Sequence, residues 1–74
     1  MSEHIGIDPD INGGKPTVTG TRISVQTVLG HLSAGDEIQD VLAAYRRLTR
    51  ADVLACLEYA AQLAGHAVTF EKIV

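Results

Sequence analysis

The chain has 74 residues, one cysteine and a net charge of −3, and 46% of its residues are hydrophobic. These totals predict one small domain, exclude an internal disulfide, and make the chain too apolar to be broadly disordered. The acidic balance argues against a simple polyanion-binding protein, and a core this small usually needs very good helix packing or a partner chain, so we expect a homodimer.

The first 23 residues are rich in turn formers and carry the alternation of short strands. DPD at 8–10 and NGG at 12–14 are turn sequences, because proline fixes φ whereas glycine and asparagine tolerate positive φ. The apolar residues of this segment stand at strand spacing or flank the turn at Gly20: Ile5, Ile7, Val18 and Ile23. Residues 1–23 are therefore predicted to form a β arm or hairpin.

The sequence GGKPT at 13–17 superficially matches a phosphate-binding loop. Such a loop needs G-x-x-x-x-G-K-[ST] with a helix directly after it, so that backbone N–H groups point at the phosphate. Here Pro16 removes a donor and the next predicted helix begins only at Ser24, so we reject nucleotide binding. Two interpretations stay open: the glycines only build a turn, or Lys15 and Arg22 on this arm also contact phosphates.

Two short helices are predicted next from their caps and from apolar residues at i, i+3, i+4 and i+7. Ser24 is the predicted cap of the first helix, and Gly35 follows its end. Asp36 is the predicted cap of the second, with Gln39 at the reciprocal capping-box position. The apolar faces are Val25, Val28, Leu29 and Leu32 in the first helix, and Ile38, Val41, Leu42 and Tyr45 in the second.

The third helix has the clearest start, because Thr49 is a good cap and Asp52 lies three residues on, near the positive end of the helix dipole. It is predicted to run to about Ala64 and to end at Gly65. Its predicted apolar face is Val53, Leu57, Ala60 and Ala64, widened by Leu54 and Ala61. Residues 66–74 are predicted to form a C-terminal tail with a short extended segment.

Three helices with short links over residues 24–65 have the outline of a helix-turn-helix domain, so the predicted fold class is mostly α with an N-terminal β arm. Three of the six basic residues lie at the second link: Arg46, Arg47 and Arg50. They would either clamp phosphates at the helix start or form a solvated link, and spacing alone does not decide. The positions of the third helix expected to face a DNA groove are Ala51, Ala55, Glu58 and Gln62. These side chains offer little to base edges, so sequence specificity would come from the helix start, the arm or DNA shape.

No spacing of Ser, His, Asp or Cys suggests catalysis, a metal site or a cofactor, so we expect a protein that is not an enzyme and has no cofactor. Cys56, on the alanine-rich helix, is interpreted as a packing residue rather than a nucleophile. The first residues show neither a basic start nor an apolar run, and no segment is long enough to span a membrane. We therefore expect a cytoplasmic protein with no membrane partner.

Several short blocks between residues 5 and 61 form a combined pattern. The blocks are Ile5, Ile11-Asn12-Gly13-Gly14-Lys15-Pro16, Gly20-Thr21-Arg22-Ile23, Leu48-Thr49 and Tyr59-Ala60-Ala61. This pattern resembles the prokaryotic domain of unknown function four-three-three family. The resemblance implies a homeodomain-like tri-helical fold with an N-terminal β arm, and members are described as VapB-like antitoxins encoded beside a PIN-like ribonuclease toxin. Two positions depart from the family pattern: Arg46 replaces a proline, and Glu37 replaces a serine cap, whose role Asp36 would take over.

The leading hypothesis is therefore a dimeric antitoxin of a type II toxin–antitoxin pair, which binds a PIN-like toxin and represses its own operon by binding promoter DNA. The predicted DNA contacts are Lys15, Arg22, Arg46, Arg47, Thr49 and Arg50. The predicted toxin contacts are Val68, Phe70 and Ile73. They lie in the C-terminal tail, which would equally well pack on its own domain or on the other copy of a dimer. The alternative is a small protein–protein interaction module without DNA binding, which the acidic net charge and the alanine-rich third helix favour.

Overall fold

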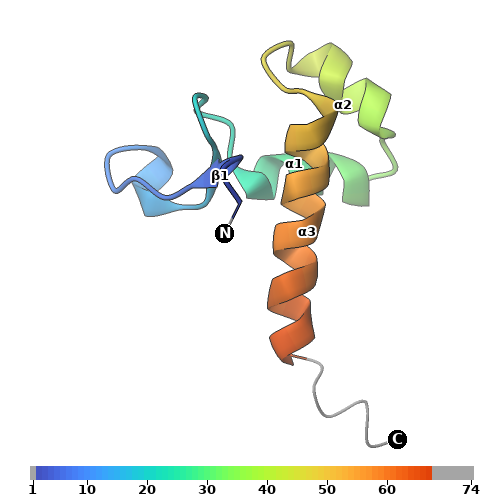
Figure 1. Ribbon diagram of the computed structural model, residues 1–74. Helices are drawn as coiled ribbons and strands as arrows, with labels where there is room; N and C mark the ends of the chain where they lie inside the picture. The colour runs from blue at the N-terminus through green and yellow to red at the C-terminus, as the bar shows by residue number, and fades with distance from the viewer. Residues whose placement is uncertain (1, 68–74) are drawn as a thin grey trace, which may run out of the picture.

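The protein consists of a short N-terminal arm and three helices, described over residues 2–67 in a computed structural model, with the backbone alone at 66–67 (Figure 1). The arm contains β1 (Ile5–Gly6), the 3-10 turn η1 (Asn12–Gly14) and β2 (Thr17–Val18). The helices are α1 (Val25–Ser33), α2 (Ile38–Ala44) and α3 (Arg50–Ala67). A mostly helical, three-helix fold with an N-terminal hairpin is thereby confirmed.

The two strands of the arm form an antiparallel pair, with Ile5 opposite Val18. After β2 the chain turns at Gly20, whose φ of +82° suits a residue without a Cβ. It then returns beside β2, where the Val18 N–H donates to the Ile23 carbonyl at 2.9 Å. The predicted hairpin is therefore present, but its two strands are joined by the turn-rich segment at 7–16. Ile23 belongs to neither strand and lies in the returning segment, which pairs with β2 through a bridge between Thr17 and Ser24.

The hydrophobic core is shared by the arm, the three helices and the α2–α3 link. Its buried side chains are Ile5, Val18, Val25, Val28, Val41, Leu48, Val53 and Cys56. Helix α3 contacts α1, α2 and β1, so the arm is part of the packed core and not a free extension. This packing fixes the position of the arm's turn relative to the start of α3.

The start of α1 is as predicted, and the start of α2 is not. The Ser24 hydroxyl caps α1 by accepting the Thr27 N–H at 3.0 Å. The cap of α2 is Glu37, whose N–H donates to the Asp40 carboxylate at 2.8 Å. The prediction of an Asp36 cap with Gln39 as its partner is wrong, because the Asp36 carboxylate lies beside a histidine ring of α1 instead.

Helix α3 differs from its prediction in both length and orientation. It continues through Gly65, where the backbone has no positive φ, to Ala67, the last residue that the structure describes. Val53 and Cys56 are fully buried, whereas Leu57 is 40% exposed. An alanine-rich helix is apolar on most sides, so contacts with α1, α2 and β1 decide which side faces the core. Within the part of the chain that the structure covers, neither α3 nor any other helix has the length and hydropathy to cross a membrane.

Candidate nucleic-acid interface

Arg47, in the α2–α3 link, reaches the turn of the arm. Its Nη2 donates a hydrogen bond to the carbonyl oxygen of Gly20 at 3.0 Å, across 27 positions of sequence. Arg47 and Arg22 also line one open hollow of about 430 Å³. We call this feature the arginine hollow; it is lined by Ile11, Gly20, Thr21, Arg22, Ile23 and Arg47. Two arginines predicted as DNA contacts, one on the arm and one in the α2–α3 link, therefore line the same hollow.

The backbone that carries Arg22 is held by hydrogen bonds within the arm. Asn12 adopts a positive φ of 53°, and its side-chain amide donates to the Arg22 carbonyl at 2.8 Å and to the Thr17 hydroxyl at 3.1 Å. The Thr21 hydroxyl donates to the Val18 carbonyl at 2.8 Å and accepts the N–H of the residue after Arg22. The sequence identified Asn12 only as a turn former. Its second role is to hold the backbone at Arg22, through a side-chain amide whose hydrogen bonds reach across the turn.

The start of α3 has the predicted reciprocal cap. The Thr49 N–H donates to Asp52 Oδ2 at 2.9 Å, and the Asp52 N–H donates to the Thr49 hydroxyl at 3.2 Å. These two N–H groups are therefore used within the helix and are not offered to a phosphate. Thr49 is exposed, but its hydroxyl already acts as an acceptor.

His4 binds the same carboxylate from the arm. Its Nδ1 lies 2.9 Å from Asp52 Oδ1. Burial raises the pKa of Asp52, but the N–H of Thr49 and the side chains of His4 and Thr49 outweigh that effect, so its pKa lies below the ordinary value of 3.8. Sequence analysis missed this contact, because residues 48 positions apart meet only when β1 packs against α3.

A second histidine ties the ends of α1 and α2 together. His31 Nδ1 lies 3.0 Å from Asp36 Oδ2, and its Nε2 lies 2.9 Å from the Tyr45 hydroxyl. The rings of His31 and Tyr45 meet edge-on, with centroids 5.3 Å apart. Tyr45 immediately precedes Arg46 and Arg47, so this contact helps to position the basic link. No signal in the sequence identified it.

The remaining predicted DNA contacts are divided between two sides of the molecule. Arg46 and Arg50 are exposed at the link and at the first turn of α3. Lys15 is also exposed but lines a different hollow, between α1 and α3. Within the described residues, the side chains of Lys15, Arg22, Arg46 and Arg50 make no hydrogen bond or ion pair. The predicted toxin contacts, Val68, Phe70 and Ile73, lie outside the described residues.

Two residues of α3 test expectations drawn from the sequence, one about a groove-facing position and one about the cysteine. Ala55, expected to face a groove, is half-buried against the core, which corrects that expectation. Cys56 is fully buried, and burial, together with the nearby Asp52 carboxylate, raises the pKa of its thiol to about 11. A thiol in that environment stays protonated at neutral pH, which fits the packing role predicted for it.

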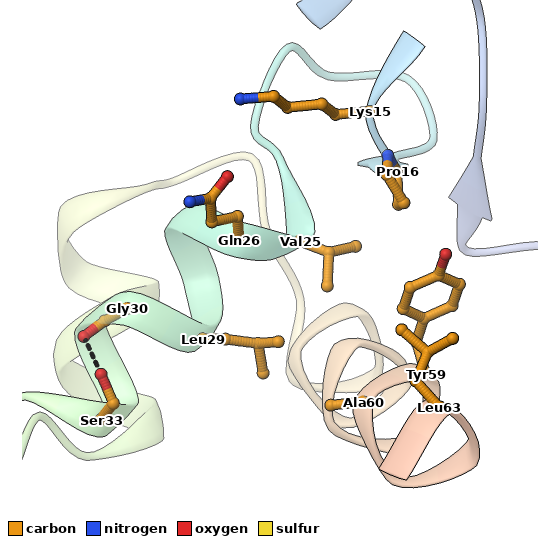
Figure 2. A pocket seen from close by; sticks show the side chains of 10 residues that line it. All are labelled: Lys15, Pro16, Val25, Gln26, Leu29, Gly30, Ser33, Tyr59, Ala60 and Leu63. Atoms are coloured by element: carbon orange, nitrogen blue, oxygen red, sulfur yellow. Dashed lines mark hydrogen bonds between the residues drawn. The ribbon is translucent and has the colours of Figure 1, made fainter. Parts of the chain in front are cut away.

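An apolar groove of about 680 Å³ runs between α1 and the C-terminal part of α3 (Figure 2). Val25 and Leu29 of α1 point into it, and Tyr59, Ala60 and Leu63 of α3 form the opposite wall. Lys15, Gln26 and Ser33 lie along its rim. The molecule therefore has two distinct surfaces, the basic arginine hollow and this apolar groove.

The comparisons with known proteins agree with this architecture. The family model described as protein of unknown function (DUF433) matches residues 5–60, and no curated protein matches the chain. The crystal structure of a DUF433 member protein from Anabaena variabilis is similar, with a TM-score of 0.76 and 34% sequence identity. The match covers 80% of this chain and 58% of that one, so this chain spans little more than half the length of that relative. Because the family model covers most of the sequence, the chain belongs to the DUF433 family of unknown function.

Proposed function

We propose that this protein binds duplex DNA through the arginine hollow and the adjacent basic link, as the antitoxin of a toxin–antitoxin pair that represses its own operon. The observation that carries the DNA half is the convergence of Arg22 and Arg47. They come from the arm and from the α2–α3 link, yet they line one hollow. Exposed Arg46 and Arg50 follow on the same link and the helix start, which extends the basic surface.

The guanidinium groups suit phosphate recognition. Each offers five N–H donors in a planar fork that matches phosphate oxygens. Arg47 uses one nitrogen on the Gly20 carbonyl, which orients the group while its other donors remain available. The exposed residues of α3 beyond its first turn are mostly alanine and leucine, which offer little to base edges. Most of the affinity would therefore come from the DNA backbone and sequence preference from DNA shape.

Salt-dependent binding to the protein's own promoter DNA tests this half of the proposal. Neutralising Z phosphates gives a slope of about −0.9Z when log K is plotted against log salt concentration. Fluorescence anisotropy of labelled promoter DNA, with and without the neighbouring gene product, measures that slope. A flat or absent binding curve in both conditions would remove DNA binding from the proposal.

The antitoxin half is supported by the family resemblance. A PIN-like ribonuclease toxin is the proposed partner, with Val68, Phe70 and Ile73 as its contacts. Co-expression of a tagged copy with the adjacent open reading frame, followed by pull-down, tests it. Recovery of a PIN-like protein whose toxicity is suppressed is the expected result, and failure to recover any such protein contradicts this half alone.

The second candidate is a protein–protein interaction module without DNA contact. The apolar groove between α1 and α3 favours it, because a lining of valine, leucine and tyrosine suits an apolar partner and not a phosphate. The acidic net charge also favours it. The promoter-binding measurement separates the two candidates, since this second one predicts no salt-dependent DNA affinity.

A further inference from the structure

The arginine hollow has apolar as well as cationic walls. Two half-buried isoleucines, Ile11 and Ile23, line it together with the exposed Arg22 and Arg47. Ile23 packs against the hydrophobic core, whereas Ile11 lies in the arm with an extended backbone, at φ −121° and ψ 124°. A phosphate needs only the arginines, so phosphate binding by itself gives the two isoleucines no role.

The hollow is also poor in hydrogen-bond acceptors. Within the described part of the chain, no aspartate, glutamate, asparagine or glutamine lines it. Its one hydroxyl, that of Thr21, already donates to a carbonyl of the arm and accepts an N–H. Four backbone carbonyls of the hollow also accept hydrogen bonds from within the protein, those of Ile11, Gly20, Arg22 and Ile23. The hollow therefore offers guanidinium donors and apolar surface, but no side-chain acceptor that is not already engaged.

These walls suit a ligand in which an anion lies next to an apolar group that carries no donor. A DNA backbone has this chemistry, because each phosphate is joined to a deoxyribose whose C2′ carries only hydrogen. RNA has a hydroxyl at that position, which is both a donor and an acceptor and by which a protein can tell RNA from DNA. Placed against isoleucine, the hydroxyl would lose its hydrogen bonds to water without gaining a partner.

We propose that the arginine hollow selects DNA over RNA, an inference that rests on the proposed binding of phosphate there. One backbone phosphate contacts Arg22 and Arg47, and the deoxyribose beside it lies on Ile11 and Ile23. The volume of the hollow, about 430 Å³, is within the range of small-ligand sites, so one sugar–phosphate unit fits. The isoleucines then determine specificity for the sugar, and the arginines supply affinity for the backbone of either nucleic acid.

Single ribose substitutions in duplex promoter DNA test this selection. Fluorescence anisotropy gives the affinity for a set of duplexes that each carry one added 2′-hydroxyl, so that the phosphates and the base sequence stay the same. Because the hydroxyl would be buried without a partner, we expect the affinity to fall about fivefold at the positions that meet the hollow and to stay unchanged elsewhere. An unchanged affinity at every position overturns the proposal.

Threonine in place of Ile11 tests whether the apolar wall makes the selection. Ile11→Thr keeps a β-branched side chain on extended backbone and gives the 2′-hydroxyl a partner, so the fivefold loss should shrink to less than about twofold. Ile7→Thr is the matched control: Ile7 lies on the same arm and is 53% exposed but does not line the hollow, so the full loss should remain. A full loss in Ile11→Thr, or an equal reduction in both variants, overturns the role of Ile11.

A measurement without DNA separates this inference from the proposed function. The probes are the methyl furanosides of 2-deoxyribose 5-phosphate and ribose 5-phosphate, titrated to millimolar concentration while the amide NMR signals of Gly20 and Thr21 are followed. The deoxyribose probe should bind about fivefold more tightly, and Arg22→Ala should weaken both probes alike. That preference in a protein that binds no promoter DNA contradicts the proposed function alone. Equal affinities, or no binding of either probe, overturn the selection for deoxyribose even in a protein that binds promoter DNA.

Discussion

The imidazole of His4 lies against the carboxylate of Asp52, with Nδ1 and Oδ1 2.9 Å apart. The same carboxylate accepts the Thr49 N–H through its other oxygen at 2.9 Å. One side chain therefore caps α3 and fastens the arm to it. This double contact fixes the start of α3, with Arg50 in its first turn, against the arm that carries Arg22.

Asp52→Asn is expected to lower the free energy of unfolding by about 1–2 kcal/mol, because an amide is a poorer acceptor for the helix cap and loses the charge opposite His4. Urea denaturation at neutral pH measures the loss. Asp10→Asn is the control, since Asp10 is an exposed acid of the arm and its replacement should change stability by less than about 0.5 kcal/mol. Equal losses in the two variants would mean that the removed charge matters and the cap does not.

The same carboxylate predicts how stability depends on pH. The pKa of Asp52 is lower in the folded chain than its ordinary value of 3.8, so the unfolded chain binds more protons between those two pH values. The contribution of Asp52 is therefore complete above about pH 5 and is lost as the pH falls through the folded pKa. Unfolding free energies measured across this range for the wild type and Asp52→Asn should converge at the acid end. A difference that stays constant would contradict the lowered pKa.

Tyr45→Phe is expected to lower the free energy of unfolding by about 0.5–1.5 kcal/mol, because His31 Nε2 loses the hydroxyl at 2.9 Å. Tyr59→Phe is the matched control, since its hydroxyl has no hydrogen bond within the part of the chain described here. Thermal and urea unfolding of the three proteins compare the two hydroxyls. If both phenylalanine variants lose the same stability, the His31 contact does not fasten α1 to α2.

The orientation of α3 is tested by two adjacent truncations. Val53 is fully buried, so Val53→Ala should cost about 2 kcal/mol from lost transfer energy and the cavity left behind. Leu54 is 45% exposed, so Leu54→Ala removes more atoms but should cost less than about 1 kcal/mol. Urea midpoints give the order directly. A larger loss at Leu54 would show that α3 is rotated relative to the core.

Local signals in the sequence predicted three features that depend on neighbouring residues. The cap at Ser24, the reciprocal cap at Thr49 and Asp52, and the apolar face that begins at Val25 depend on residues within two turns of each other. Those predictions are confirmed, as is the pairing of the arm into a hairpin. Each depends on contacts that a short stretch of chain makes with itself.

The predictions that failed depend on side-chain contacts that capping and spacing patterns do not describe. Asp36 was expected to cap α2, but His31, five residues earlier, takes its carboxylate. The face of α3 was predicted only in part: Val53 is buried as expected, but alanine and leucine surround most of the helix, and packing against α1 and β1 buries Cys56 and leaves Leu57 exposed. The arginine hollow was predicted as two separate sets of residues. Only the fold brings Arg22 to Arg47.

The most direct test of the account compares how three proteins lose DNA affinity with salt. For the wild type, Arg22→Ala and Lys15→Ala, affinity for promoter DNA is measured at several salt concentrations, with the unfolding free energies checked to be equal. If the arginine hollow binds phosphate, Arg22→Ala should make the slope of log K against log salt shallower by about 0.9, whereas Lys15→Ala should leave it unchanged. Equal slopes for all three proteins, or a change only in Lys15→Ala, would contradict the account.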